Sequence, residues 1–493
     1  MTIFKDMKKY LIAALLLPVL ATSCMNDLDV VQKSVIDSQN MWKTEGDLTG
    51  AMAGSYYRFR AAYKINMSYW GDFRSGVIGP GMGSFNGLAL STNNLSSAEG
   101  KGTNWATLYT CINQCNLILK YVDGVDYNND NTRLEIKANA YFMRAYCYFT
   151  IARVWGDAPL MLEGIEGTDA DLLPVRSDVS LIYAQVESDV NEALAQMPAA
   201  VSKRSTASLG AVNMLRTDYY LWKYRTLNGS ADDLAAAKQS CGDVLENSAY
   251  KLLDNYADVF AVDKKKNDEV IMCIAFVKTT EESTNYMDDY LIPLSKMTDN
   301  VSYANNESVK VGSEDQWYSF SVSYQKFLYA NPLDSRAPIN FTSFTVPDSG
   351  NTYSWINKFP GEWSDNTRYF TSDIPLYRYS EAILFMAEIL NEEDNQADAI
   401  GYINRIAKRA YKVENYYPAG MAYDQVAETI LNERLKEFAA ECKSWWDYIR
   451  MGYAFIKIPS LAGRQAETNI LLWPVAKACF ENNANIRQTV GYN

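Results

Sequence analysis

The feature that most constrains the fold is the segment Arg133–Trp155, in which apolar and small residues repeat with the period of an α-helix. One row comprises Ile136, Ala140, Met143, Tyr146/Cys147, Thr150/Ile151 and Val154, and the other comprises Ala138, Tyr141/Phe142, Ala145, Tyr148/Phe149 and Ala152. A helix that is apolar on two faces has to be buried between neighbouring elements. Gly156 and Pro159 follow it in the order typical of a helix end.

Further segments have the same helical pattern and are separated by short breakers. They are Ser180–Gln196, Ser208–Leu227, Asp232–Glu246, Leu376–Glu392, Asn395–Arg409 and Asp424–Arg450. Pro198 and Asn228-Gly229 are among the breakers between them. Helices of 15 to 20 residues or so joined by short turns pack as antiparallel pairs, so the pattern predicts a mainly α-helical scaffold of hairpins.

Two regions lack this pattern. Residues 66–104 contain six glycines in close succession, and residues 250–372 are rich in Ser, Asn, Asp, Tyr and Trp. Within the second region, Val270–Phe276 is a short apolar run that we expect to form a strand. The many aromatic residues in an irregular polar stretch indicate a loop-rich lobe laid over the helical scaffold.

Composition excludes several kinds of function. The 493 residues include no histidine, so Ser-His-Asp or Cys-His catalysis and His-based zinc sites are ruled out. The net charge of −13 disfavours binding to nucleic acid. Seven cysteines lie beyond Cys24 without the spacing of a metal site, and we expect them to be small buried apolar residues: Cys111, Cys115, Cys147, Cys241, Cys273, Cys442 and Cys479.

The first 23 residues have the character of a signal peptide. Three lysines precede the apolar run Tyr10–Leu20, which is too short to span a bilayer as a helix. Small residues then lead directly to Cys24, as in a lipobox, where cleavage before the cysteine leaves a lipid-anchored chain. The alternative is a plain secretory signal in which the cysteine is coincidental. We expect lipidation at Cys24, because a cysteine directly after such a run of small residues is rarely a coincidence. No later run is long enough for a transmembrane helix, so we expect the chain to be anchored to a membrane without crossing it.

Several stretches resemble signatures of the SusD/RagB family of outer-membrane lipoproteins. The first are Glu135–Phe149 (EIKANAYFMRAYCYF) and Arg153–Leu160 (RVWGDAPL); Trp105–Leu119, Ile374–Asn391, Ile430–Arg450 and Leu472–Tyr492 also match. The match covers the whole mature length in the right order. The sequence departs from the family where Cys442 follows Glu441 in place of the usual glycine, and where Ser444 replaces an arginine.

The resemblance implies a scaffold of tetratricopeptide-like helical hairpins with a loop-rich second lobe containing short strands. We therefore expect the following division: 1–23 signal peptide, 24–65 lipid-anchored segment and first helix, 66–104 loops of the ligand site, 105–249 tetratricopeptide-like helices, 250–372 second lobe, and 373–493 the C-terminal helices. The resemblance also implies a lipid-anchored protein on the outer face of the outer membrane. Its partner would be a SusC-like TonB-dependent transporter that receives the captured glycan.

Acidic and basic residues are frequent in these signatures. They are Arg144, Arg153, Asp157, Arg378, Glu381, Glu388, Glu433, Arg434, Glu437, Asp447 and Arg450. Glu433 and Glu437 lie four apart on one helical face, and paired carboxylates are what a glycosidase requires. Arginines accompany these acids, however, and would lower the carboxylate pKa values where a general acid needs a raised one. We therefore predict a structural ion-pair network and no catalysis.

Two other motifs are incomplete. Gly79–Ser84 is glycine-rich but neither follows a convincing strand nor opens a helix, as a phosphate-binding loop would. Asp126–Asn131 begins like a calcium-binding loop but lacks its glycine and its final glutamate, so it is interpreted as a turn between helices. No motif indicates a cofactor, although calcium assistance is left open.

The binding site is predicted in the irregular regions. A sugar presents apolar C–H faces and hydroxyl rims, so its capture requires an exposed aromatic ring beside planar hydrogen-bonding groups. The residues chosen on this basis are Trp70, Asp72, Arg74, Trp317 and Tyr318. The predicted ligand is an oligosaccharide; the alternatives are a peptide captured by the same architecture and, more remotely, a carboxylate-dependent surface glycosidase.

Overall fold

The computed structural model describes residues 41–167, 173–199, 203–278, 284–297, 301–312 and 315–492. The predicted signal peptide and Cys24 lie outside these ranges. The longer helices are α2 (Glu45–Tyr63), α5 (Ala106–Tyr121), α6 (Asp130–Trp155), α7 (Val179–Gln196), α8 (Leu209–Thr226), α9 (Ala231–Leu245), α13 (Tyr379–Glu392), α14 (Gln396–Tyr411) and α15 (Tyr423–Glu437). The shorter ones are α3 (Asn66–Gly71), α4 (Leu88–Ser91), α10 (Ser302–Asn305), α11 (Val322–Leu328), α12 (Ala337–Asn340), α16 (Ser444–Arg450), α17 (Ala454–Lys457) and α18 (Lys477–Glu481).

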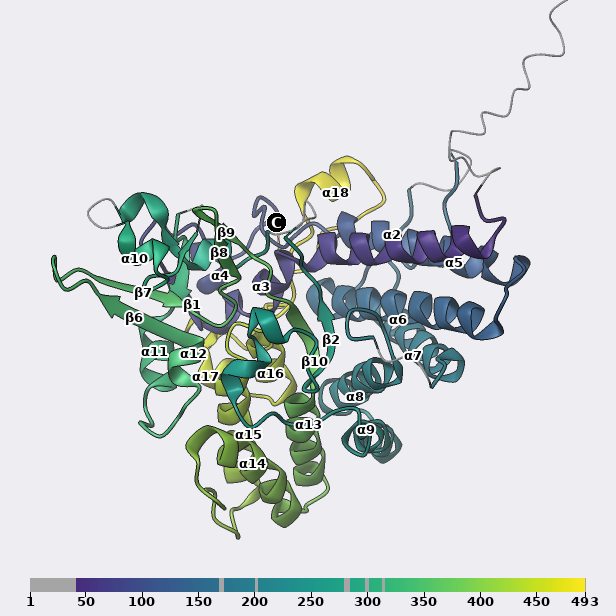
Figure 1. The fold of residues 1–493 in the computed structure, drawn as a ribbon. Coiled ribbons are helices and arrows are strands. Elements are labelled where there is room, and N and C mark those ends of the chain that lie inside the picture. Colours follow the sequence, from purple (N-terminus) through teal and green to yellow (C-terminus); the bar gives the residue numbers. More distant parts are fainter. Residues whose placement is uncertain are drawn as a thin grey trace, which may run out of the picture.

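The long helices stack as antiparallel neighbours, which confirms the predicted scaffold of helical hairpins. Figure 1 shows the array running from α2 and α5 through α6, α7, α8 and α9 to α13 and α14. Helix α6 lies between α5 and α7 and is buried along most of its length, as its two apolar rows predict. Asn129 caps its first turn, so the calcium-like motif before it serves as a turn between helices.

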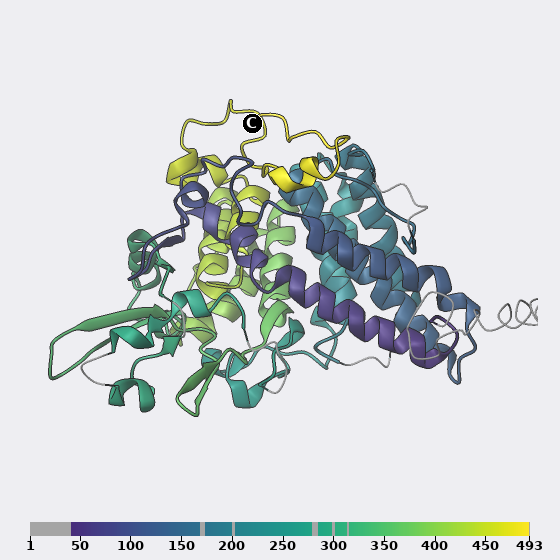
Figure 2. The ribbon, with the colours of Figure 1, turned by 90° about the horizontal axis from the view of Figure 1, so that it is seen from above.

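The second lobe carries most of the strands. They are β1 (Ile78–Pro80), β2 (Val270–Ile274), β3 (Ile292–Pro293), β4 (Val311–Gly312), β5 (Tyr318–Phe320), β6 (Phe341–Thr345), β7 (Thr352–Ile356), β8 (Glu362–Ser364), β9 (Thr367–Tyr369) and β10 (Ile374–Arg378). They form two-stranded sheets: β1 with β5, β2 with β10, β3 with β4, β6 with β7, and β8 with β9. The lobe lies to one side of the helical array, with the β6–β7 hairpin projecting from it (Figures 1 and 2).

The predicted strand at Val270–Phe276 is confirmed as β2. It pairs antiparallel with β10, which leads directly into α13, so the two ends of the irregular region are joined at the scaffold. Residues 376–378 were expected to begin a helix and instead belong to β10. Tertiary pairing overrides helical periodicity here, since both strands are buried on every residue.

Two further expectations need correction. Residues 66–104 are not loop alone, because they contain α3, α4 and β1. The helix expected over Asp424–Arg450 is two helices, α15 and α16, separated by a turn in which Ala440 and Cys442 have positive φ angles of 58° and 62°. The family's usual glycine at the position of Cys442 is therefore explained, since this conformation favours glycine. A Cβ atom on Gly71 would lie 1.9 Å from the Cys442 carbonyl oxygen, so α3 packs against this turn.

The predicted ion-pair network is confirmed in the buried core. Arg378 donates to Glu269 at 2.7 Å, to Glu437 at 2.6 Å and to Glu441 at 2.8 Å. Further buried pairs join Arg144 to Asp189, Arg153 to Asp218, Arg336 to Asp334, Glu433 and Glu437, Arg409 to Glu269 and Glu437, Arg434 to Glu381 and Asp447, and Arg450 to Glu388 and Asp447. Asp157 is the exception in the predicted set: it is exposed and accepts a hydrogen bond from the Val179 backbone.

The cysteines behave as predicted. The seven that the structure describes are free thiols, of which six are buried and Cys479 is partly buried. No helix within the described ranges is both long and apolar enough to cross a membrane.

Candidate functional site

The antiparallel pairing of β1 with β5 brings the two irregular regions together. Ile78 pairs with Phe320, Gly79 with Ser319, and Pro80 with Tyr318, although these strands lie more than 200 residues apart in the chain. The pairing continues beyond the strands, since the Gly81 amide donates to the Trp317 carbonyl and the Gly83 amide to the Gln316 carbonyl. We call this junction the seam.

The glycines at the seam are required by close backbone approach. A Cβ atom on Gly81 would lie 2.2 Å from the Gln316 carbonyl oxygen. Gln316 is itself fixed, because its side-chain amide donates to the carbonyls of Tyr290 and Ser354 and accepts from the Met82 amide. The glycine-rich segment is thus shaped to lie against β5, which agrees with the absence of a phosphate-binding motif.

Four side chains form an aromatic and amide surface around Tyr318. The Tyr318 ring meets the Phe85 ring edge-on at 6.2 Å, and its hydroxyl group donates to the side-chain oxygen of Asn86. Its hydroxyl also interacts with that of Tyr69. Asn86 is exposed, Tyr69 and Phe85 are partly buried, and Tyr318 is buried beneath them. This group, Tyr69–Phe85–Asn86–Tyr318, is called the seam cluster below.

The electrostatic surroundings keep the hydroxyl groups of the seam cluster protonated. Burial, assisted by the negative charges of Asp289 and Glu99, raises the pKa of Tyr69 to about 12. The same causes, with Tyr69 itself, raise the pKa of Tyr318. Protonated phenols can both donate and accept, and the Asn86 amide adds donors and a second acceptor lone pair. The seam cluster therefore combines ring surface with hydrogen-bonding groups, as a sugar requires.

The structure places four of the five predicted site residues inside the protein. Trp70 is 1% exposed; its ring packs at 5.8 Å from those of Tyr63 and Trp155, and its indole N–H donates to the Gly102 carbonyl. Arg74 is fully buried and donates to Asn93 and to the carbonyls of residues 470–472. The expectation that these side chains are presented on an exposed loop is wrong, because α3 directs Trp70 into the core and the following 3₁₀ helix Phe73–Ser75 directs Arg74 there.

Asp72 holds the turn that precedes α16. Its carboxylate accepts from the Ser444 hydroxyl at 2.7 Å and from the Cys442 amide at 3.2 Å. Ser444, where the family has an arginine, thus supports a buried hydrogen bond. Burial raises the pKa of Asp72 to about 6, although these donors and Lys358 act in the opposite direction.

Trp317 is the one predicted residue whose side chain is partly accessible, and Tyr318, its neighbour, is buried. Successive side chains along an extended strand point to opposite faces, so the two rings do not form the adjacent pair that the sequence suggests. Trp317 lies at the seam through its backbone contact with Gly81.

Phe85 and Asn86 were missed by sequence reasoning. The available signal was an aromatic residue next to an amide, immediately after the glycine-rich run. Their contact with Tyr318 depends on the β1–β5 pairing, which is too distant in the chain to be read from periodicity.

The carboxylates considered for glycosidase chemistry form buried ion pairs with arginines. Burial alone would raise the pKa of Glu437, but Arg409, Arg378 and Arg336 hold it well below its ordinary value. Glu433 accepts from Arg336, Tyr411 and Tyr417. A general acid at neutral pH needs the opposite shift. The described part of the chain also contains no cluster of three or more side chains suited to holding a metal ion.

A second concave surface lies away from the seam. It is a cleft of about 510 Å³ between α5, α18, residues 159–165 and Pro174, lined by Trp105, Tyr109, Ile112, Met161 and Ile486 among others. The amides of Asn113 and Asn116 at this cleft are already bonded to backbone groups. Asn104 and Asn482, which also line the cleft, are exposed, as Asn86 is in the seam cluster. The seam cluster differs in that it joins both irregular regions.

Replacing Trp70 with alanine is expected to lower the free energy of unfolding by about 3–5 kcal/mol, because it removes a fully buried aromatic ring. The matched control is Tyr57→Ala on α2, whose side chain is 54% exposed and whose loss should cost less than about 0.5 kcal/mol. Urea unfolding of both variants gives the comparison. Equal stability of the two variants would contradict the buried position of Trp70.

The raised pKa of Asp72 predicts how the stability of the folded protein depends on pH. Its pKa in the folded protein, about 6, lies above its ordinary value of 3.8, so the folded state binds the proton more tightly. The associated stability is fully present below about pH 4 and is lost as the pH rises through 6. The free energy of unfolding of the protein relative to Asp72→Asn should therefore fall by about 2–3 kcal/mol between pH 4 and pH 7. Urea titrations at a series of pH values measure this difference in the free energy of unfolding. A difference that does not change with pH would contradict the prediction.

Comparison with known proteins agrees with this architecture of helical hairpins bearing a strand-containing lobe. The model of the SusD family matches residues 220–492, more than half of the chain, and a model described as "Starch-binding associating with outer membrane" matches residues 80–212. The chain therefore belongs to the SusD family.

Relatives and solved structures are similar over most of their lengths. The SusD-like protein P25 of Formosa agariphila is 25% identical, with 87% of each chain covered. The starch-binding protein SusD of Bacteroides thetaiotaomicron is 24% identical, with 77% of this chain and 76% of that protein covered. The structure of B. fragilis NanU superposes with a TM-score of 0.80 at 25% identity, covering 93% of this chain and 99% of NanU.

Proposed function

We propose that this chain is a glycan-binding protein of the outer-membrane surface that captures oligosaccharide without cleaving it. The observation that carries the proposal is the β1–β5 pairing, which assembles the seam cluster from both irregular regions. Membership of the SusD family and the similarity to a starch-binding relative support a carbohydrate ligand. The pairing of the core carboxylates with arginines supports binding without catalysis.

We propose further that Cys24 carries a lipid anchor and that the captured glycan passes to a SusC-like TonB-dependent transporter. The anchor is supported by the lipobox-like residues before Cys24, and the transporter by the family. The seam cluster is a shallow surface, which favours modest affinity. Retention of the glycan would then depend on closure over the transporter.

Phe85 and Asn86 are proposed as the main ligand contacts, with Tyr69 behind them. Trp317 is retained as a contact at the edge of the seam. Four buried residues are proposed to support the site without contacting the ligand. They hold in place the segment between α3 and β1 and the side chain of Asn86, and they are Trp70, Asp72, Arg74 and Tyr318.

The proposal is tested by native gel electrophoresis through a panel of polysaccharides, using the chain expressed from Met25, which retains all the described residues. Selective retardation by one polysaccharide without release of reducing ends is expected. Release of new ends would contradict the non-catalytic role. Migration unaffected by every polysaccharide, combined with co-purification of peptides, would favour the peptide-binding alternative.

A further inference from the structure

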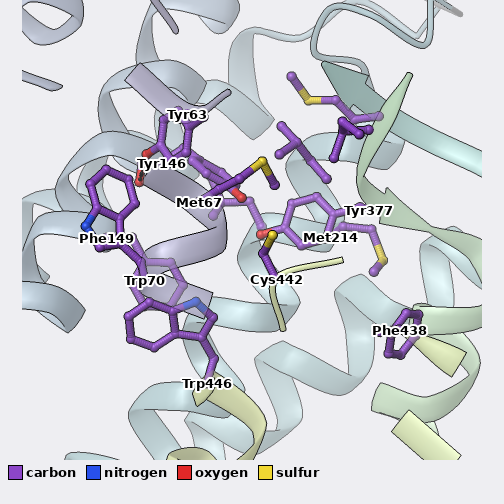
Figure 3. Close-up of a cluster of buried hydrophobic side chains, with 14 of the residues drawn as sticks. Tyr63, Met67, Trp70, Tyr146, Phe149, Met214, Tyr377, Phe438, Cys442 and Trp446 are labelled. Atoms are coloured by element: carbon purple, nitrogen blue, oxygen red, sulfur yellow. Dashed lines mark hydrogen bonds between the residues drawn. The ribbon is translucent and has the colours of Figure 1, made fainter. Parts of the chain in front are cut away.

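A small cavity lies where the N-terminal helices meet the C-terminal helices. It measures about 40 Å³, and its walls include Trp70 of α3, Arg153 of α6, Asp218 of α8, Arg434 of α15 and Asp447 of α16. Figure 3 shows the apolar part of this region, with Tyr63, Met67, Trp70, Tyr146 and Trp446 gathered around Cys442. The cavity therefore adjoins the ring that was expected to contact ligand.

Several polar atoms at the cavity lack a hydrogen-bond partner within the described part of the chain. They are Nε of Arg153, Nη1 of Arg434 and Oδ2 of Asp447, and all three residues are more than 90% buried. Arg434 Nη2 donates to Glu381 at 2.9 Å, Arg434 Nε lies 2.8 Å from Asp447 Oδ1, and Asp447 Oδ1 accepts from Arg450 at 3.0 Å. A buried donor or acceptor without a partner lowers the stability of the fold by roughly 1–3 kcal/mol. Three such atoms at one cavity therefore indicate that a bound ligand provides their hydrogen bonds.

The pair formed by Arg153 and Asp218 is a further indication of incomplete hydrogen bonding at the cavity. Nη1 of Arg153 lies 3.6 Å from Oδ2 of Asp218, beyond hydrogen-bond distance, although both side chains are buried. At this separation the two groups form an ion pair without a direct hydrogen bond, so part of their hydrogen-bonding capacity is open to a ligand beside them. Asp218 otherwise accepts from the Tyr377 hydroxyl at 3.2 Å.

We propose that the cavity binds ordered water molecules that complete the ion-pair network between the two helical regions. A volume of about 40 Å³ leaves room for water, since a cavity needs only about 10–15 Å³ to hold one molecule. These waters hydrogen-bond to Nε of Arg153, Nη1 of Arg434 and Oδ2 of Asp447.

Water fits this cavity better than an ion. The unpartnered atoms include both donors and an acceptor, and only a ligand that donates and accepts satisfies both. The charged lining is balanced, with four cations (Arg153, Arg434, Lys443, Arg450) and four carboxylates (Asp218, Glu381, Glu441, Asp447). Neither an anion nor a cation is therefore favoured by net charge.

The direct test is a high-resolution crystal structure of the chain expressed from Met25. Density for ordered waters within about 3.2 Å of Nε of Arg153, Nη1 of Arg434 and Oδ2 of Asp447 is expected. A cavity without such density would overturn the proposal. Crystals soaked in bromide should show no anomalous peak in the cavity, and crystals under xenon pressure should show no xenon; a peak in either would indicate an anion site or a dry apolar cavity.

A solution measurement keeps the proposal testable without crystals. Water ¹⁷O magnetic relaxation dispersion should detect long-lived internal water, and its amplitude should fall in Met67→Trp, which fills the cavity from α3. The matched control is Met82→Trp, whose side chain is exposed at the seam. An unchanged amplitude in a folded Met67→Trp variant would contradict water at this position.

Discussion

Replacing Arg378 with methionine is expected to lower the free energy of unfolding by about 3–5 kcal/mol, a large part of the roughly 5–15 kcal/mol that is typical of a folded protein. Arg378 is fully buried and compensates three carboxylates, those of Glu269, Glu437 and Glu441. Removing it leaves buried negative charge without a partner, which costs more than the ion pairs contribute. Urea unfolding at pH 7 measures the loss.

The pH dependence of this variant separates lost charge compensation from lost packing. Arginines hold the pKa values of Glu437 and Glu441 below their ordinary values against the effect of burial. Without Arg378 those values rise, so protonation near pH 5 should recover part of the stability difference. Lys477→Met, which removes an exposed pair with Glu481, is the matched control and should change stability by less than about 1 kcal/mol. A deficit equal at pH 5 and pH 7 would indicate that packing alone is lost.

Replacing Phe85 and Asn86 together with alanine is expected to weaken glycan binding about 10- to 100-fold, equivalent to about 1.4–2.8 kcal/mol. The change removes both the ring face and the exposed amide of the seam cluster, and it leaves the backbone pairing of β1 with β5 intact. Affinity electrophoresis and calorimetry with the polysaccharide identified by the panel measure the effect.

Two variants control this comparison. Tyr57→Ala removes a more exposed aromatic ring from α2, in the helical array, and should leave binding unchanged. Trp317→Ala tests the edge of the seam and should weaken binding less than the double substitution. Full affinity in the double variant, with its thermal stability unchanged, would exclude the seam cluster as the binding surface.

The helical scaffold could be predicted from sequence because its signals are local. Helix α6 has two apolar rows and a Gly–Pro end, and its boundaries differ from the prediction by only a few residues. The ion-pair network was also predictable, because arginines stand beside acids in the signature stretches. The break between α15 and α16 was not predicted from the sequence. Cys442 adopts the left-handed backbone conformation there, and no glycine, the residue that usually indicates this conformation, is present at that position.

The candidate site lies in the irregular regions that the sequence indicates, but four of the five side chains chosen from the sequence are buried. Trp70 and Arg74 have the chemistry of a sugar platform, but α3 packs against the turn before α16 and buries them. Which aromatic residues of an irregular segment face solvent is decided by contacts from distant parts of the chain. Here those contacts are made by residues 440–444 and 470–473. The residue types of the irregular segment do not reveal which distant residues will cover it.

The most direct test is a crystal structure of the chain with an oligosaccharide of the type that retards it in the panel. The account predicts a sugar ring against Phe85, with hydroxyl groups hydrogen-bonded to Asn86 and Tyr69, on the surface that β1 and β5 assemble. A sugar bound instead in the cleft between α5 and α18, with the seam cluster unoccupied, would contradict it.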